Sequence, residues 1–388
     1  MKKKICFIST SRADYNFLKP LVVASKKETK FKTFFLVTGT HLIKKYGYSI
    51  NEIIKDKLKI DEKISINLNK RSTSENISCL SGEYLKQFSK YFKKINPDYL
   101  VLLGDRYEIL SAAISAYIMN IPIIHIAGGE VTEGSYDDGF RHSITKLSNI
   151  HFVTTDQHRK RVIQLGENPK TVFNTGSIGL ISLKKNKYLK KKDIEKKLKT
   201  KFFKKNAILT FHPETSGSVN NKRIFKCIFK ALNSFKDLKV FITAPNLDKG
   251  RDEIVKEILK NKKKFPKKNI YIPTLGSQLY YSLAKISDGV IGNSSSGISE
   301  IPSLKVGTLN LGFRQTGRPM AKSVINLNNV NNLKLKKNIN KLFSKKFKKV
   351  AKNSVNPFYK KDTDKKVLFL IKKILFSKKI ENKKFYDL

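Results

Sequence analysis

Short apolar runs alternate with helical patterns along most of the chain. Each run of about three to six mostly hydrophobic residues ends in small or polar residues, and the stretch that follows often repeats its apolar positions every three or four residues. This alternation predicts parallel strands, buried on both faces, in a doubly wound α/β sheet. The first part of the chain yields predicted strands Ile5–Ile8, Phe34–Val37, Tyr99–Leu103, Ile123–Ile126, Phe152–Thr154 and Val172–Asn174, and predicted helices Tyr15–Lys26, Ser74–Ile95, Glu108–Ile118 and Arg141–Ser148.

The alternation stops in a lysine-rich stretch and then restarts. The second series has predicted strands Ala207–Phe211, Val240–Thr243, Ile270–Ile272, Gly289–Ile291 and Thr308–Leu311, and predicted helices Lys222–Ser234, Asp252–Lys262, Gln278–Ile286 and Gly297–Pro302. A chain of 388 residues is long enough for two domains. We therefore expect one domain over 1–180, a linker or helix over 181–205, a second domain over 206–355, and a C-terminal helix within 356–388 that packs back on the first domain. Two such halves predict a ligand cleft between them.

The chain has an extreme positive charge, and most of its cations are lysine rather than arginine. It carries 79 Lys and Arg against 31 Asp and Glu, a formal charge of +48 that would suit a nucleic acid or an anionic membrane. Only ten of these cations are arginine, the residue that nucleic-acid binders use for bidentate contacts. Half of the arginines fall in the polar motifs described below. We therefore expect a lysine-rich surface with neither a nucleic-acid nor a membrane partner.

The cysteines and the start of the chain favour the cytoplasm. Cys6, Cys79 and Cys227 are far apart, without metal-ligand spacing or a disulfide framework, as in a reducing compartment. The apolar run Ile5–Ile8 is too short for a signal peptide, and no run approaches the ~18 apolar residues that span a bilayer.

Ionisable side chains follow two of the strands in the first half. Gly104-Asp105-Arg106-Tyr107-Glu108 comes directly after one strand, and Gly128-Gly129-Glu130 comes after the next, with Asp137, Asp138, Arg141 and His142 close behind. Ligands of open α/β sheets bind beyond the carboxyl ends of the strands. Carboxylates, Arg and His that converge there can supply acid, base and anion-binding groups, which predicts an enzyme.

Two strand-to-helix turns are candidate anion sites. Ser9 to Tyr15 opens the first helix, where free backbone N–H groups, Ser11 and Arg12 would favour an anion, although Ser and Asp there are also good helix caps. Gly292 to Glu300 is rich in glycine and serine, which predicts diphosphate binding, with Glu300 placed to accept two ribose hydroxyls.

The histidines differ in context. His212, in Phe211-His212-Pro213-Glu214, ends a strand at the predicted cleft, and His41 occupies the equivalent place after the second strand. His125 lies within a strand and is interpreted as a hydrogen-bonded core residue.

These motifs together resemble the hydrolysing UDP-N-acetylglucosamine 2-epimerases of sialic-acid-type sugar synthesis. The resemblance runs from Ser11 to about Pro357. Its matching segments are Ser11–Tyr15, Thr38–Leu42, Gly104–Glu108, Gly128–Glu130 with Asp137–His142, His212–Glu214, Gly292–Glu300 and Asn310–Arg318.

The family implies a GT-B fold of two Rossmann-like domains with the active site in the cleft between them. It implies a UDP-sugar substrate held mainly by the second domain, a homo-oligomer, and no cofactor or metal. The implied reaction removes the C2 proton of UDP-N-acetylglucosamine with anti elimination of UDP, and water then adds to the glycal to give N-acetylmannosamine.

Site residues are carried over by the same resemblance. The catalytic candidates are Asp105, Glu130, Asp137 and His212. The substrate-binding candidates are Arg12, His41, Arg106, Asn246, Ser294, Ser295, Gly297, Glu300, Arg314 and Arg318.

One departure from the family pattern concerns Ala127, where family members often have a glutamate. If that glutamate is an acid or base, its task falls here to Glu130, Asp138 or water, and a small side chain leaves room for a different sugar. The alternatives are therefore the same chemistry on UDP-2,4-diacetamido-2,4,6-trideoxyglucose for legionaminic acid, a non-hydrolysing epimerase, and a GT-B glycosyltransferase. A basic nucleic-acid or membrane-surface protein is the alternative from another class.

Overall fold

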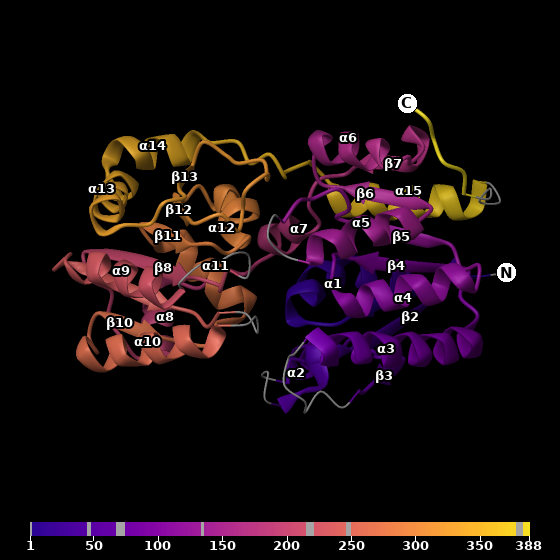
Figure 1. Ribbon diagram of the computed structural model, residues 1–388, viewed down its shortest axis with the longest axis horizontal. Helices are drawn as coiled ribbons and strands as arrows, with labels where there is room; N and C mark the ends of the chain where they lie inside the picture. Colours follow the sequence, from indigo (N-terminus) through magenta and orange to yellow (C-terminus); the bar gives the residue numbers. More distant parts are fainter. Residues whose placement is uncertain are drawn as a thin grey trace. The chain divides into compact units, whose positions relative to one another are not determined.

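The computed structural model describes residues 2–44, 48–66, 74–132, 136–214, 221–245, 250–377 and 383–388. The chain divides into two compact units, each with its own sheet (Figure 1). Unit 1 comprises Met1–Glu130, Tyr136–Ser182 and Lys360–Leu388, and unit 2 comprises Val131–Ser135 and Leu183–Tyr359.

The sheet of unit 1 has seven parallel strands in the order β3-β2-β1-β4-β5-β6-β7. This is the doubly wound arrangement, in which the direction of winding reverses between β1 and β4. The strands are β1 (Lys3–Ser9), β2 (Phe31–Thr38), β3 (Glu62–Ile64), β4 (Tyr99–Leu103), β5 (Ile123–Ile126), β6 (Ile150–Val153) and β7 (Val172–Asn174). The helices are α1 (Arg12–Lys27), α2 (Ile50–Lys55), α3 (Ser74–Ile95), α4 (Tyr107–Ile118), α5 (Asp137–Leu147), α6 (Asp156–Gln164), α7 (Gly179–Lys184) and α15 (Thr363–Ser377), with 3-10 turns η1 (Gly39–Leu42) and η3 (Pro169–Thr171).

Unit 2 repeats the arrangement with six parallel strands in the order β10-β9-β8-β11-β12-β13. The strands are β8 (Lys205–Thr210), β9 (Leu238–Ile242), β10 (Asn269–Tyr271), β11 (Gly289–Gly292), β12 (Thr308–Leu311) and β13 (Val324–Leu327). The helices are α8 (Lys191–Leu198), α9 (Asn221–Asn233), α10 (Arg251–Lys264), α11 (Gly276–Ile286), α12 (Ser296–Ser299), α13 (Asn332–Phe343) and α14 (Lys345–Asn353), with the 3-10 turn η4 (Ile301–Leu304).

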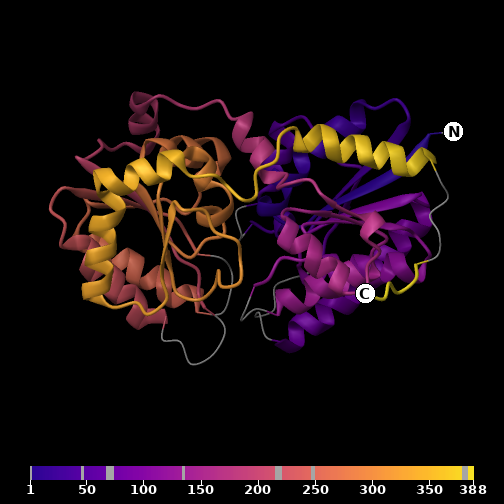
Figure 2. The ribbon, with the colours of Figure 1, turned by 90° about the horizontal axis from the view of Figure 1, so that it is seen from above.

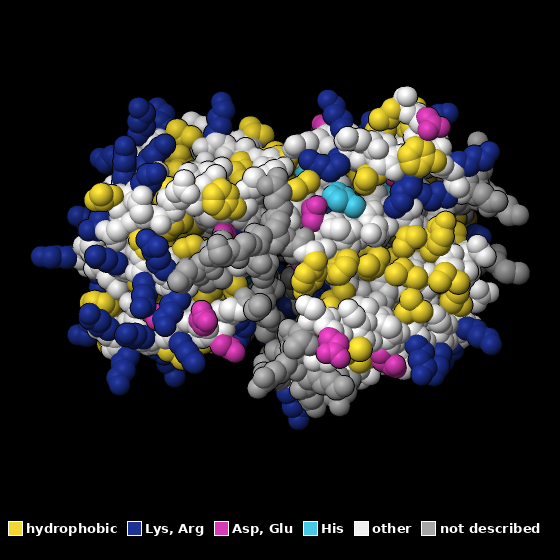
Figure 3. Space-filling view, viewed as in Figure 1, with side chains coloured by type: hydrophobic (Ala, Val, Ile, Leu, Met, Phe, Trp, Pro, Cys, Tyr) yellow, Lys and Arg dark blue, Asp and Glu magenta, His cyan; other side chains and the backbone are white. Residues whose placement is uncertain are grey.

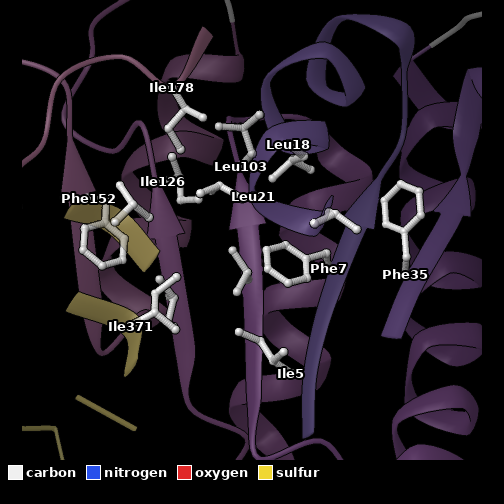
Figure 4. Close-up of a cluster of buried hydrophobic side chains, with 14 of the residues drawn as sticks. Ile5, Phe7, Leu18, Leu21, Phe35, Leu103, Ile126, Phe152, Ile178 and Ile371 are labelled. Atoms are coloured by element: carbon white, nitrogen blue, oxygen red, sulfur yellow. The ribbon is translucent and has the colours of Figure 1, made fainter. Parts of the chain in front are cut away.

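Both faces of the sheet of unit 1 are covered by helices, as the continuous apolar strands predict. Along β1, Ile5 and Phe7 point to a core shared with α1 and α15, while Cys6 and Ile8 point to a core shared with α3, α4 and α5. Figure 4 shows the first of these cores, in which Phe7 lies among side chains from several strands and helices. The predicted doubly wound α/β class is confirmed for both units.

The C-terminal helix α15 belongs to unit 1. Its residues Val367, Ile371 and Leu375 are buried in the same core as Phe7, and Phe376 stacks on Phe31 with ring centroids 6.0 Å apart. Figures 1 and 2 both show α15 running beside the sheet of unit 1, next to segments from the start of the chain. The sheet therefore depends for part of its cover on residues more than 300 positions further along the sequence.

Several elements differ from the sequence-based expectation. The edge strands β3 and β13 were not predicted, because edge positions are half exposed and tolerate polar residues such as Glu62 and Lys63. The helix α6 was not predicted either, since only His158 and Val162 in it are buried. The expected helix Gly297–Pro302 is instead the short α12 followed by η4.

No helix in the described ranges is long and apolar enough to cross a membrane.

The packing of α15 generates a stability prediction. Ile371 is fully buried, so Ile371→Ala should lower the free energy of unfolding by about 2–4 kcal/mol, through lost burial and a residual cavity. Urea denaturation followed by circular dichroism measures this change. Phe369→Ala, on the same helix at a position 64% exposed, is the matched control and should change stability by less than about 1 kcal/mol. Equal losses in the two variants would contradict the packing of α15 described here.

Candidate active site

The segment after β4 carries an ion pair in which the carboxylate is buried and the arginine side chain is 39% exposed. Gly104, with φ +87°, turns the chain after Leu103 so that Asp105 and Arg106 follow the strand. Arg106 donates from Nε and Nη2 to the two carboxylate oxygens of Glu108, at 3.1 and 2.9 Å. Glu108 is fully buried, so it requires this bidentate partner. Arg106, a predicted substrate-binding residue, therefore already balances a carboxylate within unit 1.

The loop after β5 is tightly constrained. Ala127 has φ +66°, in the left-handed region that L residues seldom adopt. A Cβ on Gly128 would lie 2.8 Å from Thr145 Oγ1, and one on Gly129 would lie 2.5 Å from the carbonyl oxygen of His158. These contacts fix the backbone that leads into Glu130.

His125 connects the ends of β4 and β5 from inside the core. Its Nε2 lies 2.9 Å from the carbonyl oxygen of Gly104, which can only accept, so Nε2 carries the proton. Nδ1 then accepts from the hydroxyl of Thr145 at 3.0 Å. Burial lowers the pKa of His125 to about 3, so the ring is neutral at physiological pH. The interpretation of His125 as a hydrogen-bonded core residue is confirmed.

Arg141 is the centre of the acidic cluster in unit 1. Its guanidinium is buried, forms an ion pair with Asp105, and lies 3.5 Å from Asp138 Oδ1. Its Nη1 also donates to the carbonyl oxygen of Glu130 at 2.9 Å. One side chain thus connects the segment after β4, the loop after β5 and the first turn of α5. The sequence placed Arg141 among the converging ionisable residues, but no role was assigned to it.

The first turn of α5 adds further ionisable groups to this edge. Asp137 and Asp138 begin the helix, where the helix dipole favours negative charge. His142 Nε2 lies 3.5 Å from Asp138 Oδ2, and burial lowers the pKa of His142. Glu130 accepts a hydrogen bond from Thr154 at 3.2 Å. The structure therefore brings Asp105, Glu130 and the start of α5 together around Arg141.

The turn after β1 differs from the expected anion site. The carboxylate of Asp14 accepts hydrogen bonds from the N–H groups of Thr10 and Ser11, at 2.8 and 2.9 Å, and forms a capping box with Ser11. Burial opposes ionisation of Asp14, but its interaction with His41 and the hydrogen bonds from Ser9 and Thr10 outweigh burial and lower the pKa of Asp14. The carboxylate of Asp14 therefore already accepts hydrogen bonds from the N–H groups that were predicted to bind an anion.

His41 and Arg12 lie near this turn. His41 is fully buried, with Nε2 2.9 Å from Ser9 Oγ and Nδ1 2.8 Å from Ser49 Oγ. In this structure the His41 ring is therefore hydrogen-bonded to Ser9, at the turn after β1. The Arg12 guanidinium is 39% exposed and lies 4.0 Å from Glu52.

In unit 2, His212 is held by its backbone. Its N–H donates to Asn293 Oδ1 at 2.6 Å, and its carbonyl oxygen accepts from Asn293 Nδ2 at 2.8 Å. This reciprocal pair connects the ends of β8 and β11. Burial, with a smaller effect from Arg314, lowers the pKa of His212 to about 3. His212 is therefore a neutral imidazole at the carboxyl edge of this sheet.

Glu214 organises the loop that follows β12. Its Oε1 accepts from the N–H of Phe313 at 2.8 Å, and the Nη1 of Arg314 donates to the Pro213 carbonyl at 3.2 Å. At Gly312 a side chain would be strained, because φ is +75°, and its Cβ, 2.0 Å from Glu214 Oε1, would displace the Glu214 carboxylate. The sequence analysis gave Glu214 no role. Its place directly after His212-Pro213, at a strand end, was the available signal.

The glycine–serine segment at α12 has two structural features. Gly292 and Gly297 serve close packing, since a Cβ on them would lie 1.8 Å from Thr210 O and 2.8 Å from Thr308 Cγ2. Among the described residues, the N–H groups of Ser294, Ser295 and Ser296 donate to no protein acceptor. Unsatisfied N–H groups at a helix start suit an anion.

Glu300 lies just beyond this segment and is buried. Its carboxylate accepts from the hydroxyl of Tyr281 at 2.7 Å, and burial raises its pKa. The sequence predicts that Glu300 accepts hydrogen bonds from ribose hydroxyls, and it would do so while also accepting from Tyr281.

The last motif encloses part of a cavity in unit 2. Arg318 donates from Nε to the Val131 carbonyl and from Nη2 to the Thr132 hydroxyl, both at 3.1 Å. A cavity of about 340 Å³ lies at the carboxyl ends of β12 and β13, lined by Asn310, Thr316, Gly317, Arg318, Met320, Asn326 and Asn328. The predicted residue Asn246 lies outside the described residues.

Comparisons with known proteins show the same fold and identify a family. A sequence profile of the UDP-N-acetylglucosamine 2-epimerase family matches residues 23–372. The chain is 39% identical to a Campylobacter jejuni GDP/UDP-N,N'-diacetylbacillosamine 2-epimerase (hydrolyzing), over 89% of each chain. It is 37% identical to the Escherichia coli polysialic acid biosynthesis protein P7, over 100% of this chain and 98% of that one. The crystal structure of a Neisseria meningitidis UDP-GlcNAc 2-epimerase bound to UDP-GlcNAc is 17% identical, with a TM-score of 0.79 over 95% of this chain and 100% of that chain.

The two doubly wound sheets define the class first: this is a GT-B-type α/β fold. The sequence matches then identify the family, and the chain belongs to the UDP-N-acetylglucosamine 2-epimerases, with hydrolysing enzymes among its relatives.

The burial of His125 generates a pH prediction. The unfolded chain binds a proton on His125 below its ordinary pKa of about 6.5, whereas the folded chain does not until about pH 3. The unfolded state then binds more protons, so the contribution of His125 to stability is complete above pH 6.5 and declines by up to about 1.4 kcal/mol per pH unit below it. Urea unfolding of the wild type and of His125→Gln at pH 7.5 and pH 5 should therefore show their difference shrinking by about 2 kcal/mol.

A second measurement covers the case in which His125→Gln fails to fold. In the wild type, the imidazole NMR resonances of His125 should stay at their neutral positions down to pH 5. Titration near pH 6.5 would contradict the buried, neutral ring.

Proposed function

We propose that the protein is a hydrolysing 2-epimerase that converts UDP-N-acetylglucosamine to N-acetylmannosamine and UDP. The reaction would remove the C2 proton, eliminate UDP in an anti manner to leave a glycal, and add water from the face that gives the 2-epimer. The observation that carries the proposal is the cluster in which Arg141 binds Asp105, Asp138 and the backbone of Glu130, since this reaction needs fixed carboxylates in a polar site.

The carboxylates of unit 1 supply the acid and base groups in this proposal. A C2 proton beside an acetamido carbon is weakly acidic, so its base must be well placed and partly withdrawn from water. Asp105 is about one quarter exposed and is held by Arg141, which suits such a base. Glu130 and Asp137 are the further candidates, and they would manage the protons of the elimination and of the water addition.

Unit 2 supplies the groups for UDP in this proposal. The departing diphosphate requires donors and cations that stabilise its growing charge. The N–H groups and hydroxyls of Ser294 and Ser295, at the start of α12 beside Gly297, support this role, with Arg314 and Arg318 as the cations. Glu300 would bind the ribose and Asn246 would take part in substrate binding.

Four further candidates have roles in the proposal, and the geometry qualifies two of these roles. Arg12 and Arg106 would add positive charge for the diphosphate, although Arg106 is paired with Glu108. Both ring nitrogens of His41 are engaged by Ser9 and Ser49, so His41 would contribute to the site by positioning the turn after β1. His212, a neutral imidazole, is able to accept a proton and is our candidate for activating the water.

A second substrate is favoured by a specific observation. Relatives at 39% and 32% identity are named as hydrolysing epimerases of N,N'-diacetylbacillosamine, which is 2,4-diacetamido-2,4,6-trideoxyglucose. Ala127, in place of a larger acidic residue, would leave space and apolar surface for such a sugar. The pathway is then sialic-type or legionaminic-type acid synthesis, according to the sugar. The homo-oligomer and the cytoplasmic location stay predictions.

An NMR time course in D2O tests the reaction and the substrate together. With UDP-N-acetylglucosamine we expect free UDP and N-acetylmannosamine that carries deuterium at C2, because the added proton comes from solvent. Turnover of the 2,4-diacetamido-6-deoxy analogue alone, to free UDP and the 2-epimer of its own sugar with deuterium at C2, would keep the chemistry and move the substrate. A folded protein that turns over neither compound would overturn the proposal and favour an acceptor-dependent glycosyltransferase.

Two variants control this assay. Asp105→Asn removes the proposed base and should reduce turnover by about 10²–10⁴-fold. Asp252→Asn is a matched change at a carboxylate whose side chain is 88% exposed, and it should leave turnover unchanged.

A further inference from the structure

Residues 383–388, here called the C-terminal segment, lie against the turn that follows α6. The N–H of Tyr386 donates to the carbonyl oxygen of Gly166 at 3.0 Å. The ring of Phe385 covers Gly166 so closely that a Cβ there would lie 2.4 Å from it. Lys146 Nζ lies 4.5 Å from the centroid of the same ring. Figure 1 shows this end of the chain beside α6. The C-terminal segment is therefore docked on unit 1 through both backbone and side-chain contacts.

Lys383 is the residue of this segment whose side chain enters unit 1. Figure 3 shows the dark blue lysine and arginine side chains projecting from the surface of both units. The Lys383 side chain, by contrast, is only 15% exposed. Its ammonium group lies 2.7 Å from Glu167 Oε2 and donates to the carbonyl oxygens of Thr145 and Ser148. A buried ammonium group is unfavourable without such partners, so these contacts specify where Lys383 lies.

The acidic partner of Lys383 is itself buried and charged. Glu167 accepts a hydrogen bond from His151 Nε2 at 2.9 Å and one from Lys146 Nζ at 3.0 Å. Burial opposes ionisation of Glu167, but its interactions with His151 and Lys383 outweigh burial and lower the pKa of Glu167. Since water reaches this ion pair poorly, salt screens it less than it screens a pair on the surface.

The contacts of Lys383 fasten one end of α5, and the acidic cluster lies at the other end. Ser148 caps the C-terminal end of α5, where the helix dipole favours a cation. Arg141 and its partner Asp138 lie in the N-terminal half. The eleven residues of α5 span only about 16 Å, so a shift of its C-terminal end is passed on to Arg141.

A second connection to the cluster starts at Thr145. Its hydroxyl is hydrogen-bonded to His125 Nδ1 at 3.0 Å, and His125 Nε2 donates to the Gly104 carbonyl at 2.9 Å. Asp105 follows Gly104 directly in the chain. The ammonium group of Lys383 donates to the carbonyl oxygen of the same Thr145, at 3.4 Å. Lys383 therefore contacts the residue from which hydrogen bonds lead to the loop that carries Asp105.

We propose that Lys383 is a positioning residue for the reaction: it fastens the C-terminal end of α5 and thereby holds Arg141 and Asp105 in the arrangement that the chemistry requires. The proposal rests on the proposed function, in which these groups serve the proton transfers. A displacement of about 1 Å by a remote change can lower a rate about a hundredfold. A lysine that only stabilised the fold would change unfolding, but not turnover by the folded enzyme.

Steady-state kinetics of Lys383→Met, with the UDP-sugar that the wild type turns over, test the positioning role. Methionine keeps much of the side-chain volume and removes the charge. We expect kcat to fall about tenfold or more, with KM changed less than about twofold, because the substrate contacts remain. Lys383→Arg keeps the charge and should restore much of kcat. Lys384→Met, at the neighbouring exposed lysine, is the matched control and should leave kcat unchanged.

Hydrogen exchange measures the fastening of α5 itself, with or without turnover. The amides of α5 should exchange at least about fivefold faster in Lys383→Met than in Lys384→Met, because the helix end is released. Phe385→Ala removes the ring from Gly166 and should loosen the C-terminal segment in the same way. It leaves Lys383 with its charged partner, so it provides the test if Lys383→Met does not fold.

The outcomes separate this proposal from the proposed function. An active wild type with unchanged kcat in a folded Lys383→Met would overturn the positioning role and leave the proposed function intact. Equal exchange of α5 in Lys383→Met and Lys384→Met would also overturn it. A folded wild type that turns over neither UDP-sugar would overturn the proposed function, and with it the role of Lys383 in the reaction, even where exchange supports the fastening of α5.

Discussion

The arrangement of the acidic groups in unit 1 depends on one buried guanidinium, that of Arg141. Removing an arginine side chain from water costs several kcal/mol unless carboxylates or carbonyls compensate it. Here the compensation comes from Asp105 after β4, the Glu130 carbonyl after β5 and Asp138 at the start of α5. These three segments are brought together by the parallel sheet, and the guanidinium then fixes their mutual positions. The chemistry that we propose requires this kind of fixed polar arrangement.

Buried or largely buried acids recur as the hydrogen-bond acceptors that hold the loops at the sheet edges. Asp14 accepts the N–H groups of the turn after β1, and Glu108 binds Arg106. Glu214 accepts the N–H of Phe313, and Glu300 accepts the hydroxyl of Tyr281. Where a parallel strand ends, the backbone N–H groups of the following loop need hydrogen-bond acceptors. A carboxylate can accept hydrogen bonds from several donors at once. Acids are scarce in this chain, with 31 Asp and Glu, and many of those near the strand ends have such roles.

The sequence predicted the central strands well and the loop chemistry only in part. Strands such as Tyr99–Leu103 and Ile123–Ile126 are buried on both faces, so their apolar runs are unambiguous. The edge strands β3 and β13 have a mixed polar pattern that no periodicity rule distinguishes from a loop. The turn after β1 was a candidate anion site. Asp14 accepts the N–H groups of this turn in the structure, but in the sequence its presence fitted a helix cap and an anion site equally well. Arg141 was recognised as one of a group, but its role depends on contacts between three separate segments.

The most direct test of the account is the kinetics of Arg141→Lys and Arg141→Met with the substrate that the chain turns over. Lysine keeps the positive charge but not the forked geometry that reaches three partners. If Arg141 positions the acid and base groups, Arg141→Lys should lower kcat by about 10²-fold or more with KM changed much less, and Arg141→Met should lower kcat further. The pH profile of kcat should shift in the lysine variant. Wild-type kcat and an unchanged pH profile in a folded Arg141→Met would contradict the account.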